Sequence, residues 1–143
     1  MENSYYRVMA LDYGDVRIGI ALSDITGFLA SGYENYTRKS LDEDCRHIAE
    51  IADNNNVKII VLGLPLNMDG TEGVRVEKTR EFADELMKYT SCKIEYLDER
   101  LTSVSAEKIL ISADVSRKKR KAVLDKLSAT IILQDYLDAN YGK

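Results

Sequence analysis

The chain has 143 residues, 45% of them hydrophobic, which is enough to bury the core of one ordinary domain. Its formal net charge of −4 argues against a protein that binds nucleic acid through overall positive charge. The longest apolar run, residues 59–66, is too short for a membrane span of about 20 residues, and no secretion signal begins the chain. We therefore expect one domain over residues 1–143 in a cytoplasmic protein without a membrane partner.

The first third of the chain has the alternation and the turn residues of three short strands. They are predicted at residues 7–12 (RVMALD), 17–23 (RIGIALS) and 32–38 (GYENYTR). Gly14 with Asp15, and Gly27, supply the turns that hairpins need. We expect these three strands to pair as antiparallel neighbours.

Helices and strands alternate over the rest of the chain. Helices are predicted at residues 40–54, 72–89, 104–112 and 121–139, and strands at 57–64 and 93–98. The strand VKIIVLGL is apolar throughout, which is typical of a central parallel strand buried on both faces. The expected fold is α/β, with a mixed five-stranded sheet of three antiparallel and then two parallel strands, and helices on both faces.

An aspartate ends the first predicted strand. Alternation puts Val8, Ala10 and Asp12 on one face, so Asp12 lies at the carboxyl end of that strand, where open sheets bind ligands. Gly14 would let the chain turn with φ above zero and keep this rim clear of a side chain. The alternative is an Asx turn, the usual role of Asp near Gly in a hairpin, and this stretch by itself favours it.

Two further acidic residues follow the strand at 93–98. If this strand runs parallel to the first, it delivers Asp98 and Glu99 to the edge that holds Asp12. Because neighbours in a strand point to opposite faces, only one of the two can lie beside Asp12, and periodicity leaves the choice open. The alternative is an ordinary polar strand end that leads into a helix N-cap at Thr102 or Ser103.

The last predicted helix carries an aspartate on a face of small residues. Asp125 shares that face with Ser128, Ala129 and Ile132, which would let the helix approach the sheet closely. A carboxylate placed there needs a partner, for which a metal ion is one candidate, and an Arg or a helix N-cap is another. Three carboxylates without histidine or thiolate would form an oxygen-only site suited to Mg²⁺ or Mn²⁺, the ions of phosphoryl chemistry.

The sequence offers few other catalytic groups. His47 is the only histidine and falls on a predicted helix face, so we expect a surface residue. Cys45 and Cys92 form no Cys-x-x-Cys pattern and are expected to be free thiols. The run RKKRK at residues 117–121 is dense in positive charge; it could bind phosphates, or it is a solvated loop between two helices.

Four ordered blocks of the chain resemble the YqgF family of ribonuclease H-like proteins: ALDYGDVRIGIALSD, IIVLGLPLNMDGTEG, YLDERLTSVSAEKIL and ADVSRKKRKAVLDKLSATIILQDYL. This family is described as containing Holliday-junction resolvases and nucleases that mature precursor 16S ribosomal RNA. The resemblance implies a ribonuclease H-like fold, which agrees with the strand order predicted above. It also implies that Asp12, Glu99 and Asp125 are the catalytic, metal-binding residues, which selects Glu99 over Asp98.

The resemblance implies a metal-dependent endonuclease that hydrolyses phosphodiester bonds with Mg²⁺ or Mn²⁺, expected as two ions. Precursor 16S ribosomal RNA is the favoured substrate, and a four-way DNA junction is the alternative. A non-catalytic nucleic-acid-binding module is the alternative from another class, whereas a kinase-like ATPase would need a second lobe for which the chain leaves little room. We expect a monomer or homodimer, with pre-ribosomal particles as candidate partners.

Candidate contacts to nucleic acid come from three parts of the chain. The expected residues are Arg17, Arg100, Arg117, Lys118, Lys119, Arg120 and Lys121. The loop that Pro65 and Gly70 frame lies ahead of a predicted helix, whose N-terminus could accept a phosphate. A plain connector is the alternative role for that loop.

Overall fold

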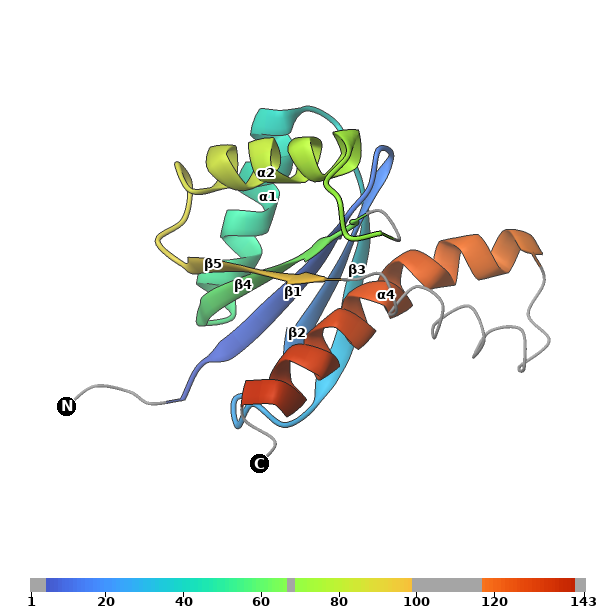
Figure 1. Ribbon diagram of the computed structural model, residues 1–143. Helices are drawn as coiled ribbons and strands as arrows, with labels where there is room; N and C mark the ends of the chain where they lie inside the picture. Colours follow the sequence, from blue (N-terminus) through green and yellow to red (C-terminus); the bar gives the residue numbers. More distant parts are fainter. Residues whose placement is uncertain (1–4, 67–68, 99–116, 141–143) are drawn as a thin grey trace.

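The computed structural model describes residues 5–66, 69–98 and 117–140, with the backbone alone described for residues 117–126. Five strands form one mixed sheet in the order β3-β2-β1-β4-β5 (Figure 1). The strands are β1 (Arg7–Tyr13), β2 (Arg17–Ser23), β3 (Ala30–Thr37), β4 (Val57–Leu64) and β5 (Lys93–Asp98). β1, β2 and β3 pair antiparallel, and β4 pairs parallel with both β1 and β5. The predicted sheet is therefore confirmed.

Helices cover both faces of the sheet, as predicted. On one face lie α1 (Leu41–Asn54) and α2 (Val74–Leu86), which pack with the strands around Met9, Leu11 and Phe82. On the other face lies the long α4 (Arg117–Asn140), which packs against Val8 and Ala10 of β1 (Figure 1). The helix predicted at 104–112 lies outside the described residues. None of the described helices is long and apolar enough to cross a membrane.

The buried stripes explain why these segments form these elements. In β4, Ile60 and Leu62 belong to the core under α1 and α2, whereas Val61 belongs to the core under α4. The strand is therefore buried on both faces, which its unbroken apolar sequence predicted. At the start of α1, the hydroxyl of Ser40 accepts a hydrogen bond from the backbone N–H of Glu43 at 3.2 Å and so caps the helix.

The boundaries of α2 and α4 differ from the prediction. α2 begins at Val74 rather than at residue 72, because the side chain of Asp69 accepts hydrogen bonds from Thr71 and holds the preceding residues in a turn. It ends at Leu86 rather than at residue 89. α4 begins at Arg117 rather than at residue 121, so the run RKKRK is helical and the alternative of a solvated loop was wrong. Arg and Lys are good helix formers, and a cluster of positive charge is not by itself a helix breaker.

Candidate active site

Asp12 lies next to the carboxyl end of β1, on the face of the sheet that α4 covers. Val8 and Ala10 pack in the core beneath α4, and Asp12 continues the same alternation. Its side chain is half-buried. Across the sheet its partner in β2 is Gly19, which places no side chain beside it on that face. The predicted position of Asp12 at the rim of the core is thus confirmed, while its chemical role stays a prediction.

The turn after Asp12 requires glycine for a reason other than the predicted one. Positive φ angles occur, among the described glycines, at Gly27 and Gly70, so the expected positive φ at Gly14 was wrong. Instead the N–H of Gly14 donates to the carbonyl of Arg17 at 2.9 Å, and a Cβ on Gly14 would lie 2.7 Å from that oxygen. Any side chain at residue 14 would therefore disturb the turn.

β5 brings Asp98 to the same edge but to the opposite face. Leu97 packs with the core under α4, whereas Ile94 packs with the core under α1 and α2. By alternation Asp98 belongs to the face of Ile94, away from Asp12. Asp98 is therefore not the acidic neighbour of Asp12. Glu99 and Arg100 lie outside the described residues.

The last helix approaches the sheet through small residues, as predicted. Ser128, Ala129 and Ile132 are all buried, and Ala129 and Ile132 pack in the core together with Ala10 of β1. Asp125 occupies the helical turn just before them. Its side chain is outside the described part of the structure, as are the side chains of Arg117, Lys118, Lys119, Arg120 and Lys121.

Arg17 begins β2 on the face that carries Asp12. Ala21 of the same strand lies in the core under α4, and two steps of alternation from it lead to Arg17. The side chain of Arg17 is half-buried. This places one of the predicted phosphate-binding cations on the face of Asp12, at the strand that pairs with β1.

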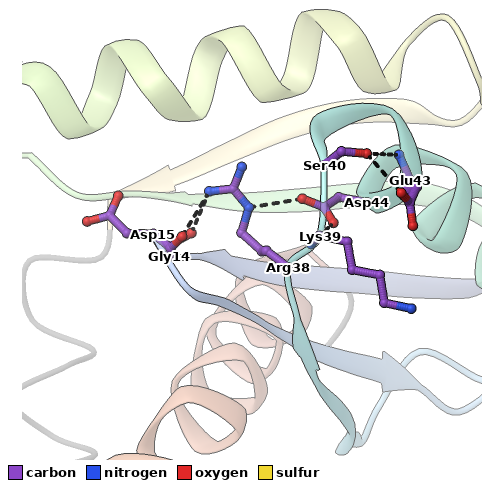
Figure 2. A network of polar contacts seen from close by, with 7 residues as sticks. All are labelled: Gly14, Asp15, Arg38, Lys39, Ser40, Glu43 and Asp44. Atoms are coloured by element: carbon purple, nitrogen blue, oxygen red, sulfur yellow. Dashed lines mark hydrogen bonds and ion pairs between the residues drawn. The ribbon is translucent and has the colours of Figure 1, made fainter.

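A polar network that the sequence analysis missed holds the turn after Asp12 (Figure 2). The guanidinium of Arg38 donates to the carbonyls of Gly14 and Asp15 at 3.1 and 3.3 Å, and to Asp44 at 3.0 Å. The side chain of Asp44 is fully buried, and it also accepts from the backbone N–H of Lys39 at 2.9 Å. No sequence motif marks these contacts, since Asp44 is one of three consecutive acidic residues in α1.

A second missed feature is a cluster of ion pairs around the same turn. Arg75 and Lys78, in the first turns of α2, approach the carboxylate of Asp15 at 3.3 and 3.8 Å. All three side chains are more than half exposed. Such exposed pairs contribute little to stability in water. The cluster therefore places exposed charge near the carboxyl edge of the sheet and does not stabilise the turn appreciably.

The histidine and the buried thiol lie on the other side of the sheet from Asp12. His47 of α1 contacts the carboxylate of Glu34 at 2.8 Å and stacks on the ring of Tyr36. Burial is the main cause that raises the pKa of the Cys45 thiol to about 12. This leaves Cys45 protonated near neutral pH and unsuited to act as a nucleophile.

Carboxylate oxygens are the donors that Mg²⁺ and Mn²⁺ prefer, and Asp12 supplies one such group at the rim. Among the side chains that the structure describes, no three His, Cys, Asp or Glu residues lie close enough together to hold a metal ion. Glu99 and Asp125, the other two predicted ligands, are not among those side chains. The donor chemistry therefore fits a hard divalent ion, and the complete centre stays a prediction.

The arrangement of strands and helices matches that of a solved structure. The structure titled "T. thermophilus RuvC in complex with Holliday junction substrate" superimposes with a TM-score of 0.60 at 10% sequence identity, covering 96% of this chain and 97% of that one. The likeness shows that the present chain has the ribonuclease H-like fold. The fold class expected from the sequence is therefore confirmed.

Sequence comparison identifies the family within this fold. A family model described as "RuvX: Holliday junction resolvase" matches residues 6–139. A protein of Halothermothrix orenii named "Putative pre-16S rRNA nuclease" is 52% identical over 132 residues, covering 92% of this chain and 94% of that protein. A relative of the same name from Halalkalibacterium halodurans is 51% identical over 134 residues, covering 92% and 96%. The chain belongs to the RuvX (YqgF) family of phosphoester-hydrolysing nucleases.

Proposed function

We propose that this nuclease processes precursor 16S ribosomal RNA, with Asp12, Glu99 and Asp125 as its acidic catalytic residues. The observation that carries the proposal is the position of Asp12, at the carboxyl end of β1 and on the face covered by the helix that contains Asp125. Relatives about half identical over more than nine tenths of both chains bear the name of a pre-16S rRNA nuclease, which supports this substrate. Asp98 lies on the opposite face, which supports Glu99, the next residue in the sequence, as the acidic partner that the family resemblance implies.

The proposed chemistry is hydrolysis of a phosphodiester bond by water. Asp12, Glu99 and Asp125 would hold Mg²⁺ or Mn²⁺, which when bound supplies activation of water and stabilisation of the leaving oxygen. Asp12 pairs with Gly19 of β2, and its neighbour Leu11 pairs with Leu62 of β4, so the backbone of Asp12 is fixed and its carboxylate starts from a defined position. Arg17, on the same face, would neutralise charge on the phosphate.

The cationic start of α4 would supply affinity rather than chemistry. Five consecutive cations occupy the first turns of this helix, which continues toward the core beneath Asp12. Contacts to backbone phosphates release counterions, so binding through this segment should weaken steeply as salt rises. Such contacts carry no base specificity, and the choice of cleavage site would come from the shape of the substrate.

The family description and the shared fold also keep a four-way DNA junction as an alternative substrate. A junction resolvase must cut two strands symmetrically and therefore needs a two-fold dimer with paired sites. Gel filtration tests this requirement: a monomer would exclude the resolvase function, because an RNA-processing enzyme has no need of a dimer. The favoured substrate would place the activity in the cytoplasm, with pre-ribosomal particles as partners and residues 1–143 acting as one domain.

The proposal is tested by cleavage of labelled precursor 16S ribosomal RNA and of a synthetic four-way junction, with Mn²⁺ or with EDTA. Wild type, Asp12→Asn and the exposed control Asp53→Asn are compared. We expect Mn²⁺-dependent cutting of the RNA that Asp12→Asn lowers at least about 100-fold, because a metal centre contributes several kcal/mol and each 1.36 kcal/mol is tenfold.

The other outcomes have distinct meanings. Efficient cutting of the junction with none of the RNA would assign the resolvase function instead. Salt-dependent binding of both substrates without any cleavage, unchanged in Asp12→Asn, would support a non-catalytic binding module.

A further inference from the structure

Arg38 binds the whole turn that follows Asp12. Its Nη1 atom donates to the carbonyl oxygens of Gly14 and Asp15 (Figure 2). Its backbone N–H donates to the carbonyl of Val16 at 2.9 Å. Three consecutive carbonyls of the turn between β1 and β2 therefore have their partner in one residue, which follows β3 directly.

The guanidinium of Arg38 also contacts a buried carboxylate, that of Asp44. The Nε atom of Arg38 lies 3.0 Å from a carboxylate oxygen of Asp44, whose side chain is 0% exposed. A buried carboxylate needs a charged or hydrogen-bonding partner, and Asp44 has both the guanidinium and the N–H of Lys39. Because α1 holds Asp44 rigidly in its first turn, the orientation of the guanidinium is fixed as well.

The same guanidinium also packs on the residue next to Asp12. It lies 4.5 Å from the ring centroid of Tyr13, and the ring of Tyr13 stacks on that of Phe82 with centroids 4.4 Å apart. Tyr13 and Asp12 are neighbours in β1 and point to opposite faces, so the direction of one sets the direction of the other. The contacts of the Tyr13 ring and of the turn carbonyls therefore restrict the backbone on both sides of the turn that follows Asp12.

We propose that Arg38 is a positioning residue for the active site, acting through the turn after Asp12. The inference rests on the proposed catalytic function of Asp12. Arg38 lies on the α1 and α2 face with Tyr13 and Phe82, so the sheet separates its guanidinium from the face of Asp12. Its guanidinium links Asp44 to the turn carbonyls, and we call this link the clamp. A guanidinium can form it because it donates hydrogen bonds to several acceptors in one plane.

The test compares Arg38→Lys with a matched control, Arg46→Lys. Lysine keeps the positive charge beside Asp44 but cannot bind the carboxylate and two carbonyls together. Arg46 resembles Arg38 in its contacts, since it pairs with Asp42 at 3.2 Å and lies over the ring of Tyr89, but it sits away from the turn. Four quantities are measured: kcat and KM for cleavage, the Kd for Mn²⁺ by calorimetry, and the melting temperature.

We expect Arg38→Lys to lower kcat by about 10- to 100-fold and to weaken Mn²⁺ binding to a similar extent, with little change in KM. These are the losses typical of a partner that orients a metal ligand. Arg46→Lys should match the wild type in both. A merely structural role would lower the melting temperature and leave kcat and the Kd for Mn²⁺ unchanged in the folded enzyme.

A second variant uses the space that Arg38 fills. A cavity of about 420 Å³ lies beside it, lined by Tyr13, Asp15, Lys78 and Phe82 among others. Arg38→Ala would open this cavity further, so added ethylguanidinium can reach the position of the lost side chain. We expect ethylguanidinium to restore kcat and ethylammonium, of the same charge, to restore none; equal rescue by both would overturn the clamp.

Asp12→Asn, measured alongside, separates failure of this inference from failure of the proposed function. If Asp12→Asn loses cleavage and Mn²⁺ binding while Arg38→Lys keeps both, the positioning role is wrong and the nuclease site stands. If Asp12→Asn changes neither cleavage nor Mn²⁺ binding, the proposed active site is wrong, and the proposed role of Arg38 is wrong as well. Should the wild type cut neither substrate, calorimetry decides: weaker Mn²⁺ binding in Arg38→Lys supports the clamp, and equal binding overturns it.

Discussion

Asp12 and Asp98 lie near the carboxyl ends of two parallel strands of one sheet, but on opposite faces. β1 and β5 both run parallel to β4, so their ends meet at one edge. Asp12 alternates with residues in the core under α4, whereas Asp98 alternates with Ile94 and Tyr96 on the face of α2. Position along the strand alone would make the two aspartates equivalent; the face distinguishes them.

This relationship predicts different effects of two neighbouring substitutions. Asp98→Asn should change kcat for RNA cleavage by less than about threefold, and Glu99→Gln should lower it at least about 100-fold, because only the second removes a proposed metal ligand. Single-turnover cleavage in Mn²⁺ measures both, with Asp12→Asn as the reference. An Asp98→Asn enzyme as inactive as Asp12→Asn would contradict the assignment of faces.

The helical start of α4 predicts a change in salt dependence. Replacing Lys118 and Lys119 by Gln should weaken RNA binding and reduce the slope of log K against log salt by about 1.5, since each phosphate contact contributes about 0.7–0.9. The measurement is a binding titration at several salt concentrations. A double variant of Lys88 and Lys93, exposed lysines outside α4, is the control and should keep the wild-type slope. Equal slopes in all three proteins would exclude this segment from the interface.

The sheet was predictable because its signals are local. Alternation in RVMALD and the continuous apolar run VKIIVLGL each reflect which faces of one strand are buried, and the structure buries those faces. The position of Asp12 followed from the same alternation. The choice between Asp98 and Glu99 did not, because it depends on which helix covers each face, and that is decided by packing between distant parts of the chain.

Two further features were beyond the reach of local patterns. The bond from Arg38 to Gly14 joins residues 24 positions apart, and nothing in the sequence around Arg38 indicates it. The reason for glycine at residue 14 is likewise a contact, with the carbonyl of Arg17, rather than a φ angle. The last helix was predicted to begin at residue 121, although the helix propensity of Arg and Lys favours an earlier start, and α4 begins at Arg117.

The close approach at Gly14 predicts a cost in both stability and activity. Gly14→Ala would place a Cβ 2.7 Å from the carbonyl oxygen of Arg17, so the turn must shift. We expect a loss of about 1–3 kcal/mol in the free energy of unfolding, typical of an overpacked site, together with a lower kcat. Urea unfolding measures the stability and cleavage kinetics measure kcat.

The control is Gly32→Ala, at an exposed position of β3, whose unfolding free energy should stay within about 0.5 kcal/mol of the wild type. A Gly14→Ala protein with an equally small change in unfolding free energy would show that the turn relaxes freely.

The buried thiol of Cys45 predicts how stability responds to alkaline pH. Burial raises its pKa to about 12 in the folded protein, whereas an unfolded cysteine titrates near 8.5. The folded state therefore holds the proton more tightly, and the resulting stability is complete below about pH 8.5 and is lost as pH rises toward 12. The stability gap between the wild type and Cys45→Ala should shrink by about 1–2 kcal/mol between about pH 7.5 and about pH 10 in urea unfolding. The control Ile48→Val leaves a small cavity on the same helix and removes no titrating group, so its difference in unfolding free energy from the wild type should stay constant with pH. A constant difference for Cys45→Ala as well would mean that folding does not raise the pKa of this thiol.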